Sequence, residues 1–295
     1  MLRGRCLFLF VLLLVTACGG DGKNDAPVPG GIVSLSPAIS ETLFALGAGE
    51  RVVGVTRFCN RPQELVDGVH SGKIAAVGDL FNPGIERIIA LRPALVLAER
   101  TSHVNKLDRL RTMDIHFVDL PLQTMADIRA MIIAVGDLVG NAAAAVEAVA
   151  RINAAFMEKI DGVMPRVLLV YYSNDPASVS AVGPISYQSE IVVQLGAKNV
   201  LAERMVVTPI LGPENILALD PDLVLELNPE PRRPTLAERW APMTTLRALK
   251  TGDVRQVEGV EVDSMGPMVE GLIHKLREAL LAWQVRHGHA RVTHR

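Results

Sequence analysis

Short apolar runs alternate with helical patterns along the chain from residue 32 onward. Residues 32–35 form a strand-like run, residues 40–46 follow with a helical pattern, and residues 51–55 form a second run. Further buried strands are predicted at residues 95–98, 116–119, 167–171 and 223–227. These runs consist mostly of branched aliphatic residues, as a sheet covered on both faces requires. Strands that alternate with helices in this way predict an α/β fold with mainly parallel sheets.

One segment of the chain is repeated. Residues 86–98 (ERIIALRPALVLA) match residues 214–226 (ENILALDPDLVLE) at eight of thirteen positions, with an offset of 128 residues. A second echo pairs residues 40–41 and 46–48 with residues 189–190 and 195–197, at an offset of 149. Unequal offsets favour two diverged lobes over a solenoid of short units. Each copy of the longer repeat is predicted to be a helix that ends near a proline and leads into a buried strand.

An alanine-rich stretch separates the two copies. In residues 141–160, apolar side chains recur at three- to four-residue spacing, which predicts one long amphipathic helix. We therefore expect two Rossmann-like lobes, an N-terminal one at residues 32–124 and a C-terminal one at residues 163–286. Connecting helices that include this backbone helix are expected at residues 125–162. Residues 287–295 are predicted to be a polar, disordered tail rather than a metal site, although three histidines lie there.

The first residues carry the features of an export signal. Arg3 and Arg5 precede an apolar run at residues 7–15, and small residues lead to Cys18. This run is shorter than the roughly 20 residues that a membrane-spanning helix needs. Residues 1–17 are therefore expected to be a signal peptide. Residues 18–31, rich in glycine, proline and aspartate, are expected to be a flexible tether.

Charge and cysteine content exclude several classes of function. Residues 1–17 hold two of the 30 basic side chains and none of the 32 acidic ones, so the remaining chain has a formal charge of −4. Such a charge predicts no binding to nucleic acid. Cys59 has no partner left for a disulfide once Cys6 leaves with the signal and Cys18 is modified, and it is predicted to be buried. Neither a Gly-x-Ser-x-Gly elbow nor a phosphate-binding loop occurs, which argues against a hydrolase.

Several motifs in order resemble a known family. They are Ser-Leu-Ser-Pro at residues 34–37, Glu41-Thr42, Val-Val-Gly-Val at residues 52–55, Val77-Gly78, and the repeat that starts at Glu86. The chain resembles the helical-backbone periplasmic binding proteins of ABC importers for cobalamin, siderophores and haem, and is most similar to the cobalamin-binding members. The resemblance implies two α/β lobes on one long helix, a ligand held between them, little hinge motion and no catalysis.

The resemblance also implies partners and a location. The partners are an ABC permease with its ATPase and a small-molecule metal chelate, and the protein is expected to be a periplasmic monomer without cofactor or bound metal. Residues 15–18 (VTAC) resemble the lipobox of bacterial lipoproteins, in which the cysteine is acylated. Cys18 is therefore expected to anchor the protein to a membrane through lipid.

Candidate ligand-binding residues lie in loops that follow predicted strands, where open α/β sheets bind their ligands. Phe58 and Phe81 offer flat apolar surface, with a place in the core as the alternative. Tyr172 and Tyr187 offer hydroxyls from the second lobe, and an exposed loop position is the alternative for Tyr187. Ser36 and Pro37 also fit a helix start that needs no ligand. The candidates are Ser36, Pro37, Arg57, Phe58, Cys59, Asn60, Leu80, Phe81, Tyr172, Tyr187 and Ser264.

Positions carried over from the family rank the ligands. Phe58 keeps the aromatic character of the cobalamin pocket, whereas Leu80 and Thr208 stand where tryptophans are expected, and Ser264 stands where an arginine is expected. Haem binders of the family tend to use a tyrosine in the loop after Val77-Gly78, which has none here, so haem is disfavoured. A corrinoid is expected first and a ferric siderophore second.

Glu86 and Glu214 open the two copies of the repeat. The matching glutamates in cobalamin-type binders dock onto arginines of the two permease subunits, so the resemblance implies permease docking here. The alternative is that each glutamate complements a helix dipole, which contributes about 0.3–1 kcal/mol and needs no partner.

Overall fold

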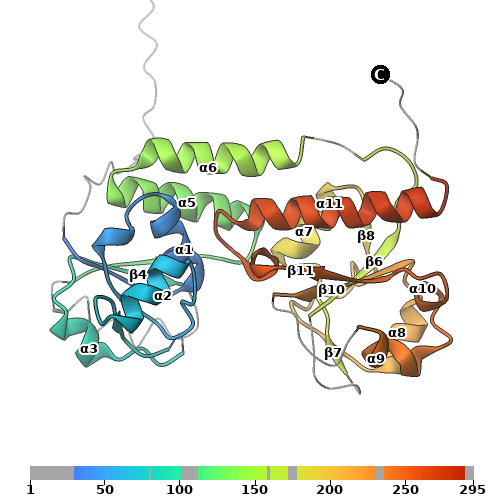
Figure 1. The fold of residues 1–295 in the computed structure, drawn as a ribbon, viewed down its shortest axis with the longest axis horizontal. Coiled ribbons are helices and arrows are strands. Elements are labelled where there is room, and N and C mark those ends of the chain that lie inside the picture. The colour runs from blue at the N-terminus through green and yellow to red at the C-terminus, as the bar shows by residue number, and fades with distance from the viewer. Residues whose placement is uncertain are drawn as a thin grey trace, which may run out of the picture.

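The computed structural model describes residues 30–79, 81–100, 110, 112–113, 115–157, 160–171, 178–229 and 236–289. Two separate parallel sheets form the centres of two lobes (Figure 1). The predicted signal peptide, nearly all of the predicted tether and Cys18 lie outside the described residues, as do Leu80 and Tyr172. Within the described part, no helix has both the length and the apolar character that crossing a bilayer would require.

The N-terminal lobe is built on a five-stranded sheet in the order β3-β2-β1-β4-β5, with all neighbouring strands parallel. The predicted runs become strands to within a residue or two, because each is apolar and bounded by turn residues. The elements are β1 (Ile32–Ser34), α1 (Pro37–Ala45), η1 (Gly49–Arg51), β2 (Val52–Val55), α2 (Gln63–His70), β3 (Ala75–Ala76), α3 (Ile85–Ala90), β4 (Leu95–Glu99) and β5 (His116–Leu120).

The C-terminal lobe has a four-stranded parallel sheet in the order β11-β10-β6-β8, beside a small antiparallel pair, β7 and β9. The elements are β6 (Arg166–Tyr171), β7 (Val179–Ser180), α7 (Tyr187–Gln194), β8 (Lys198–Asn199), β9 (Ile210–Leu211), α8 (Pro213–Leu219), β10 (Leu223–Asn228), α9 (Leu236–Trp240), η2 (Ala241–Met243), α10 (Arg247–Lys250), β11 (Val254–Glu258), η3 (Val260–Asp263) and α11 (Val269–Arg286). The prediction of an α/β protein with mainly parallel sheets is confirmed.

Two helices connect the lobes, α5 (Met125–Val139) and α6 (Ala142–Ala155). Both run along one edge of the molecule, and α11 continues along that edge over the C-terminal lobe (Figure 1). A Cβ on Gly136 of α5 would overlap Ala145 of α6, so glycine lets the two helices pack closely. The backbone helix is α6, and it ends at Ala155 rather than at residue 160, because the chain turns at Phe156 and Met157.

The repeats fold alike in the two lobes. The longer repeat forms α3-β4 in one lobe and α8-β10 in the other, and both copies pass through a left-handed residue, Arg92 (φ 47°) and Asp220 (φ 40°), before the proline. The shorter echo forms the helices α1 and α7, each followed by a glycine with positive φ, Gly47 (74°) and Gly196 (99°). Equivalent local conformations at equivalent positions support the interpretation of two related lobes.

Alternation along the strands divides the core into three clusters. Ile32 and Leu97 of the first sheet and Leu169 and Leu225 of the second belong to one large cluster, which also includes buried residues of α1, α5, α6, α7 and α11. The opposite faces of the two sheets pack into separate clusters, one around Val33 and Val96 and one around Leu168, Val224 and Trp240. Each sheet is therefore covered on both faces, as its aliphatic strands predict.

Candidate functional site

The loops after β2 and β3 bring two exposed aromatic side chains and an ion pair together. The rings of Phe58 and Phe81 lie edge to face with centroids 6.5 Å apart. The Arg57 guanidinium lies 5.2 Å from the centroid of the Phe58 ring and pairs with Asp79 Oδ2 at 3.0 Å. Cation and ring attract each other in this geometry. Both loops follow the carboxyl ends of neighbouring strands, where the candidates were predicted.

Backbone contacts hold these two loops in place. The Arg57 amide donates to the Gly78 carbonyl (2.9 Å), and Asp79 Oδ1 accepts from the amides of Phe81 (2.8 Å) and Asn82 (2.7 Å). Gly78 has φ 105°, and a Cβ there would lie 2.8 Å from Asn82 O and Gly84 N. The turn therefore requires glycine at residue 78 and aims Phe81 outward.

Phe58 and Phe81 are 42% and 57% exposed. The alternative of a place in the core is therefore excluded for both. Asn60, in the same loop as Phe58, is also exposed. Two exposed aromatic rings beside a cation provide a surface for an apolar, planar molecule, which is the chemistry expected of these loops.

Ser36, Pro37 and Cys59 have structural roles. Ser36 is the N-cap of α1 and Pro37 lies in the first turn, as predicted, but the Ser36 side chain does not cap the helix. Instead its buried hydroxyl donates to Glu99 Oε2 at 3.4 Å, and burial raises the pKa of Glu99 against this hydrogen bond. Cys59 is buried, as predicted, with its sulfur 3.2 Å from Ser40 Oγ and 3.3 Å from Thr56 Oγ1.

A polar cluster joins the two lobes. Glu41 of α1 is 4% exposed and accepts from Ser264 Oγ (2.8 and 2.9 Å) and from the Met268 amide (2.9 Å). Arg61 Nε lies 3.6 Å from Glu41 Oε2, and Arg61 Nη2 lies 2.7 Å from Asp263 Oδ1. Burial raises the pKa of Glu41, opposed by the hydrogen bonds from Met268 and Ser264 and by the charge of Arg61.

Two predicted ligand-binding residues of the second lobe, Ser264 and Tyr187, are buried near this cluster. Ser264, predicted to face ligand, is 1% exposed and its hydroxyl is engaged with Glu41. Tyr187 is neither an exposed loop residue nor a surface handle: it begins α7, is 5% exposed, and its hydroxyl has no hydrogen-bond partner among the described residues. Burial raises the pKa of Tyr187 far above its usual range. The half-buried Tyr171 accepts from Gln188 Nε2 at 2.9 Å instead.

Sequence reasoning missed Arg61, Asp79 and Tyr171 as members of this region. Arg61 follows directly on the predicted loop, and Asp79 stands between Gly78 and the predicted Leu80-Phe81 pair, so proximity in sequence was a usable signal. Tyr171 carried a weaker signal as the last residue of a predicted strand. Asp79 and Arg61 each pair with a charged residue of another loop or lobe, and no periodic pattern in the sequence indicates such pairs.

Glu86 and Glu214 are exposed residues in the first turns of α3 and α8. Both helices lie on the side of the molecule away from α6 (Figure 1). The helix-end position of both carboxylates agrees with the dipole alternative as well as with docking.

The end of the chain is ordered further than predicted. The His287 ring lies 4.7 Å and the His289 ring 5.5 Å from the Trp283 ring, and His287 Nε2 is 2.8 Å from Asp253 Oδ2. Residues 287–289 therefore pack on the C-terminal lobe, because an indole and a buried carboxylate offer them partners. Among the described residues, no group of three or more histidine, cysteine or acidic side chains is placed to hold a metal ion.

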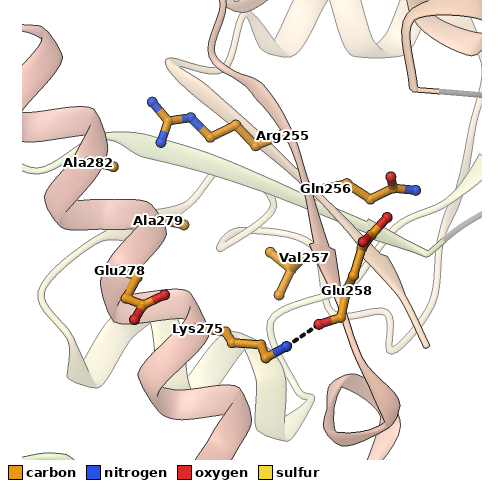
Figure 2. Close-up of a pocket in the computed structure, with 8 residues that line it drawn as sticks. All are labelled: Arg255, Gln256, Val257, Glu258, Lys275, Glu278, Ala279 and Ala282. Carbon is orange, nitrogen blue, oxygen red and sulfur yellow. Dashed lines mark hydrogen bonds between the residues drawn. The ribbon is translucent and has the colours of Figure 1, made fainter. Parts of the chain in front are cut away.

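A hollow of about 450 Å³ lies between β11 and α11, away from the predicted candidates (Figure 2). Four of its eight lining residues are charged, and Lys275 Nζ donates to the Glu258 carbonyl across it. Arg255 projects from β11 and Glu278 from α11 (Figure 2). This hollow offers no large apolar surface for a macrocycle.

Two lobes, each built on a parallel sheet, are connected by helices along one edge of the molecule, and aromatic residues lie in loops at strand ends. This architecture is that of a two-lobed solute-binding protein. The chain belongs to the periplasmic binding protein family, whose model matches residues 32–257. It is 23% identical over 235 residues to a vitamin B12-binding protein of Pectobacterium atrosepticum, covering 77% of this chain and 81% of that protein. It is 26% identical over 263 residues to an ABC transporter substrate-binding lipoprotein of Bacillus subtilis, covering 85% and 80%.

Solved structures show the same fold. The periplasmic vitamin B12-binding protein BtuF of Vibrio cholerae superposes with a TM-score of 0.68 at 19% identity, over 86% of this chain and 97% of that one. The periplasmic haem-binding protein HutB of the same organism gives 0.68 at 18% identity, over 87% and 98%. The expectation of a non-enzymatic, extracytoplasmic solute-binding protein is confirmed, with a small-molecule ligand and a permease partner implied by the family.

Proposed function

We propose that this protein captures a large metal chelate and delivers it to an ABC permease. A corrinoid is the first candidate for the chelate. The observation that carries the proposal is the exposed pair Phe58 and Phe81 beside Arg57, at the strand ends of the N-terminal lobe. Relatives named for vitamin B12 support the choice of ligand. The ligand would lie between the lobes, with the aromatic pair against its apolar face.

A ferric siderophore is the second candidate. The Arg57 side chain is 68% exposed beside the rings, and an anionic chelate would compete with Asp79 for its guanidinium. The two candidates differ in charge, and a comparison of affinities at low and high salt separates them.

The test of the proposal is Phe58→Ala. Loss of an exposed aromatic contact weakens binding by roughly ten- to a hundredfold, because an aromatic face contributes a few kcal/mol at about 25 cal/mol per Å² before the costs of binding. Calorimetry with cobalamin and with a ferric siderophore measures the change. Met157→Ala is the matched control, since Met157 is 79% exposed after the end of α6 and is not one of the candidate residues. Unchanged affinity of Phe58→Ala for every ligand that binds would remove Phe58 from the site.

We also propose that the protein is tethered through lipid on Cys18, with residues 18–31 as the spacer. The signal-like start and the cysteine at the expected cleavage point support this. Acyl chains contribute about 0.8 kcal/mol per buried CH₂, and stable anchoring needs two signals or chains. Cys18→Ser should move the protein from the membrane to the soluble fraction. Retention of the variant on membranes after a salt wash would contradict the lipid anchor.

A further inference from the structure

Two glutamates at equivalent positions of the shorter repeat each accept a hydrogen bond from a helix start elsewhere in the chain. Glu41 on α1 accepts from the amide of Met268, the residue directly before α11, at 2.9 Å. Glu190 on α7 accepts from the amide of Met125, the first residue of α5, at 2.8 Å. The two glutamates are the second members of the Ser-Glu pairs at residues 40–41 and 189–190.

The two contacts cross between the lobes in opposite directions. Helix α1 belongs to the N-terminal lobe and α11 lies over the C-terminal lobe, whereas α7 belongs to the C-terminal lobe and α5 lies along the N-terminal one (Figure 1). The partners of the first contact are 227 residues apart and those of the second are 65 apart. The first contact therefore joins lobe to lobe, and the second joins the C-terminal lobe to the connecting helix α5, which shares a core cluster with α1 of the N-terminal lobe.

A carboxylate at a helix start is a favourable arrangement. The first amides of a helix have no partner within the helix, and the helix dipole places partial positive charge there. Hydrogen bonds to an ionised acceptor are about twice as strong as neutral ones. Of the two contacts, the one at Glu41 has the more favourable surroundings. Ser264 donates to the same carboxylate, and burial keeps water away from it.

The backbone around Glu41 is shaped to receive the carboxylate. A Cβ on Gly266 would come 2.6 Å from Glu41 Oε1 and 3.1 Å from the Ala38 carbonyl, so a larger residue would push the loop away from α1. The ion pair between Arg61, in the loop before α2, and Asp263, at the end of η3, adds a second bridge between the lobes at 2.7 Å. The close approach is therefore built from several residues rather than from one flexible side chain.

We propose that Glu41 and Glu190 are paired positioning residues that hold the two lobes at one fixed separation. Both lobes share one large hydrophobic cluster, which keeps them together, and two hydrogen bonds on different helices restrict how the lobes rotate relative to each other. If the ligand lies between the lobes, as in the proposed function, the pair keeps its two contact surfaces pre-arranged and lowers the cost of binding.

The experiment measures the distance between the lobes without ligand. Ala90 on α3 and Ala218 on α8 are exposed and occupy equivalent repeat positions, so Ala90→Cys and Ala218→Cys supply one spin label per lobe. The full chain carries Cys6→Ser and Cys18→Ser, and the buried Cys59 stays unlabelled under native conditions. Double electron–electron resonance is compared for Glu41→Gln, Glu190→Gln and the double variant. Glu147→Gln, with its side chain 75% exposed and paired with Arg151 on the same helix, is the control.

Each single variant is expected to broaden the distance distribution, and the double variant to broaden it most, while Glu147→Gln leaves one narrow peak. A narrow, unshifted peak in the folded double variant overturns the proposal, and a response to one glutamate alone overturns the pairing. If Glu41→Gln fails to fold, Ser264→Ala, which removes one donor to the same carboxylate, and the half-buried Glu190 still provide the test. The distances require no ligand, so a failure of the proposed function in calorimetry leaves this result independent.

Discussion

The loop after β2 turns consecutive side chains to opposite sides of the protein. Phe58 is 42% exposed, whereas the next residue, Cys59, is 6% exposed with its sulfur between Ser40 and Thr56. The buried thiol and its hydroxyl partners tie the loop to α1, which steadies the ring that precedes it. Residues of one short candidate segment thus divide into an exposed aromatic surface and a buried anchor for that surface.

Cys59 should react slowly with thiol reagents in the folded protein. Burial raises the pKa of its thiol above the usual value near 9.0, against hydrogen bonds from Ser40 and Thr56, so the reactive thiolate is scarce at pH 8. In a chain with Cys6→Ser and Cys18→Ser, labelling by a disulfide reagent should be at least about tenfold slower than after addition of denaturant. An added Ala90→Cys thiol is the exposed control.

The raised pKa of Cys59 also makes the free energy of unfolding depend on pH. A thiol whose folded pKa is raised contributes stability that is complete below its unfolded pKa and is lost as the pH rises through the folded value. Unfolding curves of Cys59→Ser and the parent chain should therefore converge as the pH rises above about 9. Rapid stoichiometric labelling of the native protein at pH 8 would contradict the buried, neutral thiol.

At the scale of elements, helix starts are stabilised in different ways. Helix α5 begins with a capping box, in which Thr124 Oγ1 accepts from the Asp127 amide (3.1 Å) and Asp127 Oδ2 accepts from the Thr124 amide (2.9 Å). Helix α1 begins at Ser36 without a side-chain cap. Burial acts to raise the pKa of Asp127, but hydrogen bonds from Thr124 and Gln123 outweigh it and lower that pKa.

Thr124→Ala should therefore destabilise the protein by about 1 kcal/mol, because an N-cap threonine satisfies an otherwise unpaired helix amide. Urea unfolding measures the loss, and Thr245→Ala, at an exposed threonine in a turn, is the control. The contribution of the Asp127 carboxylate is present above the unfolded pKa near 3.8 and is lost as the pH falls through the lowered folded value. Equal losses of unfolding free energy for both substitutions would show that the capping box does not stabilise the protein.

At the scale of the whole molecule, the two related lobes present equivalent helices, α3 and α8, on the side away from α6 (Figure 1). A partner with two similar subunits can meet such a surface with two similar contacts. Exposed carboxylates contribute to docking specificity and association rate more than to ligand affinity. We propose on this basis that Glu86 and Glu214, one from each lobe, dock onto the permease.

Replacing Glu86 and Glu214 together with alanine should abolish stimulated transport in vesicles that contain the permease and its ATPase. Ligand affinity should stay unchanged because both side chains are exposed at helix ends, and the unfolding free energy should fall by no more than about 1 kcal/mol per residue. Glu147→Ala on α6 is the control from the opposite edge. Normal uptake by the double variant, or an equal loss of ligand affinity, would return both residues to the role of helix-end charges.

The sequence by itself determined the α/β class, the buried strands and the two related lobes. Residues 95–98 and 223–227 could be predicted as strands because apolar runs and the prolines before them act over a few neighbouring residues. The repeat could be found because it preserves local conformation, down to the left-handed Arg92 and Asp220. Phe58 and Phe81 were predictable as site candidates because each follows a strand in a parallel sheet.

Only the tertiary structure decided which polar groups meet. Ser264 and Glu41 lie 223 residues apart, and neither hydrophobic periodicity nor loop position indicates that the hydroxyl is buried against the carboxylate. Tyr187 belongs to the core and His287 to a contact with Asp253 for the same reason. Periodicity reports the environment of a residue along its own helix or strand, whereas hydrogen bonds between lobes depend on how whole elements pack, and that packing is set by the entire core at once.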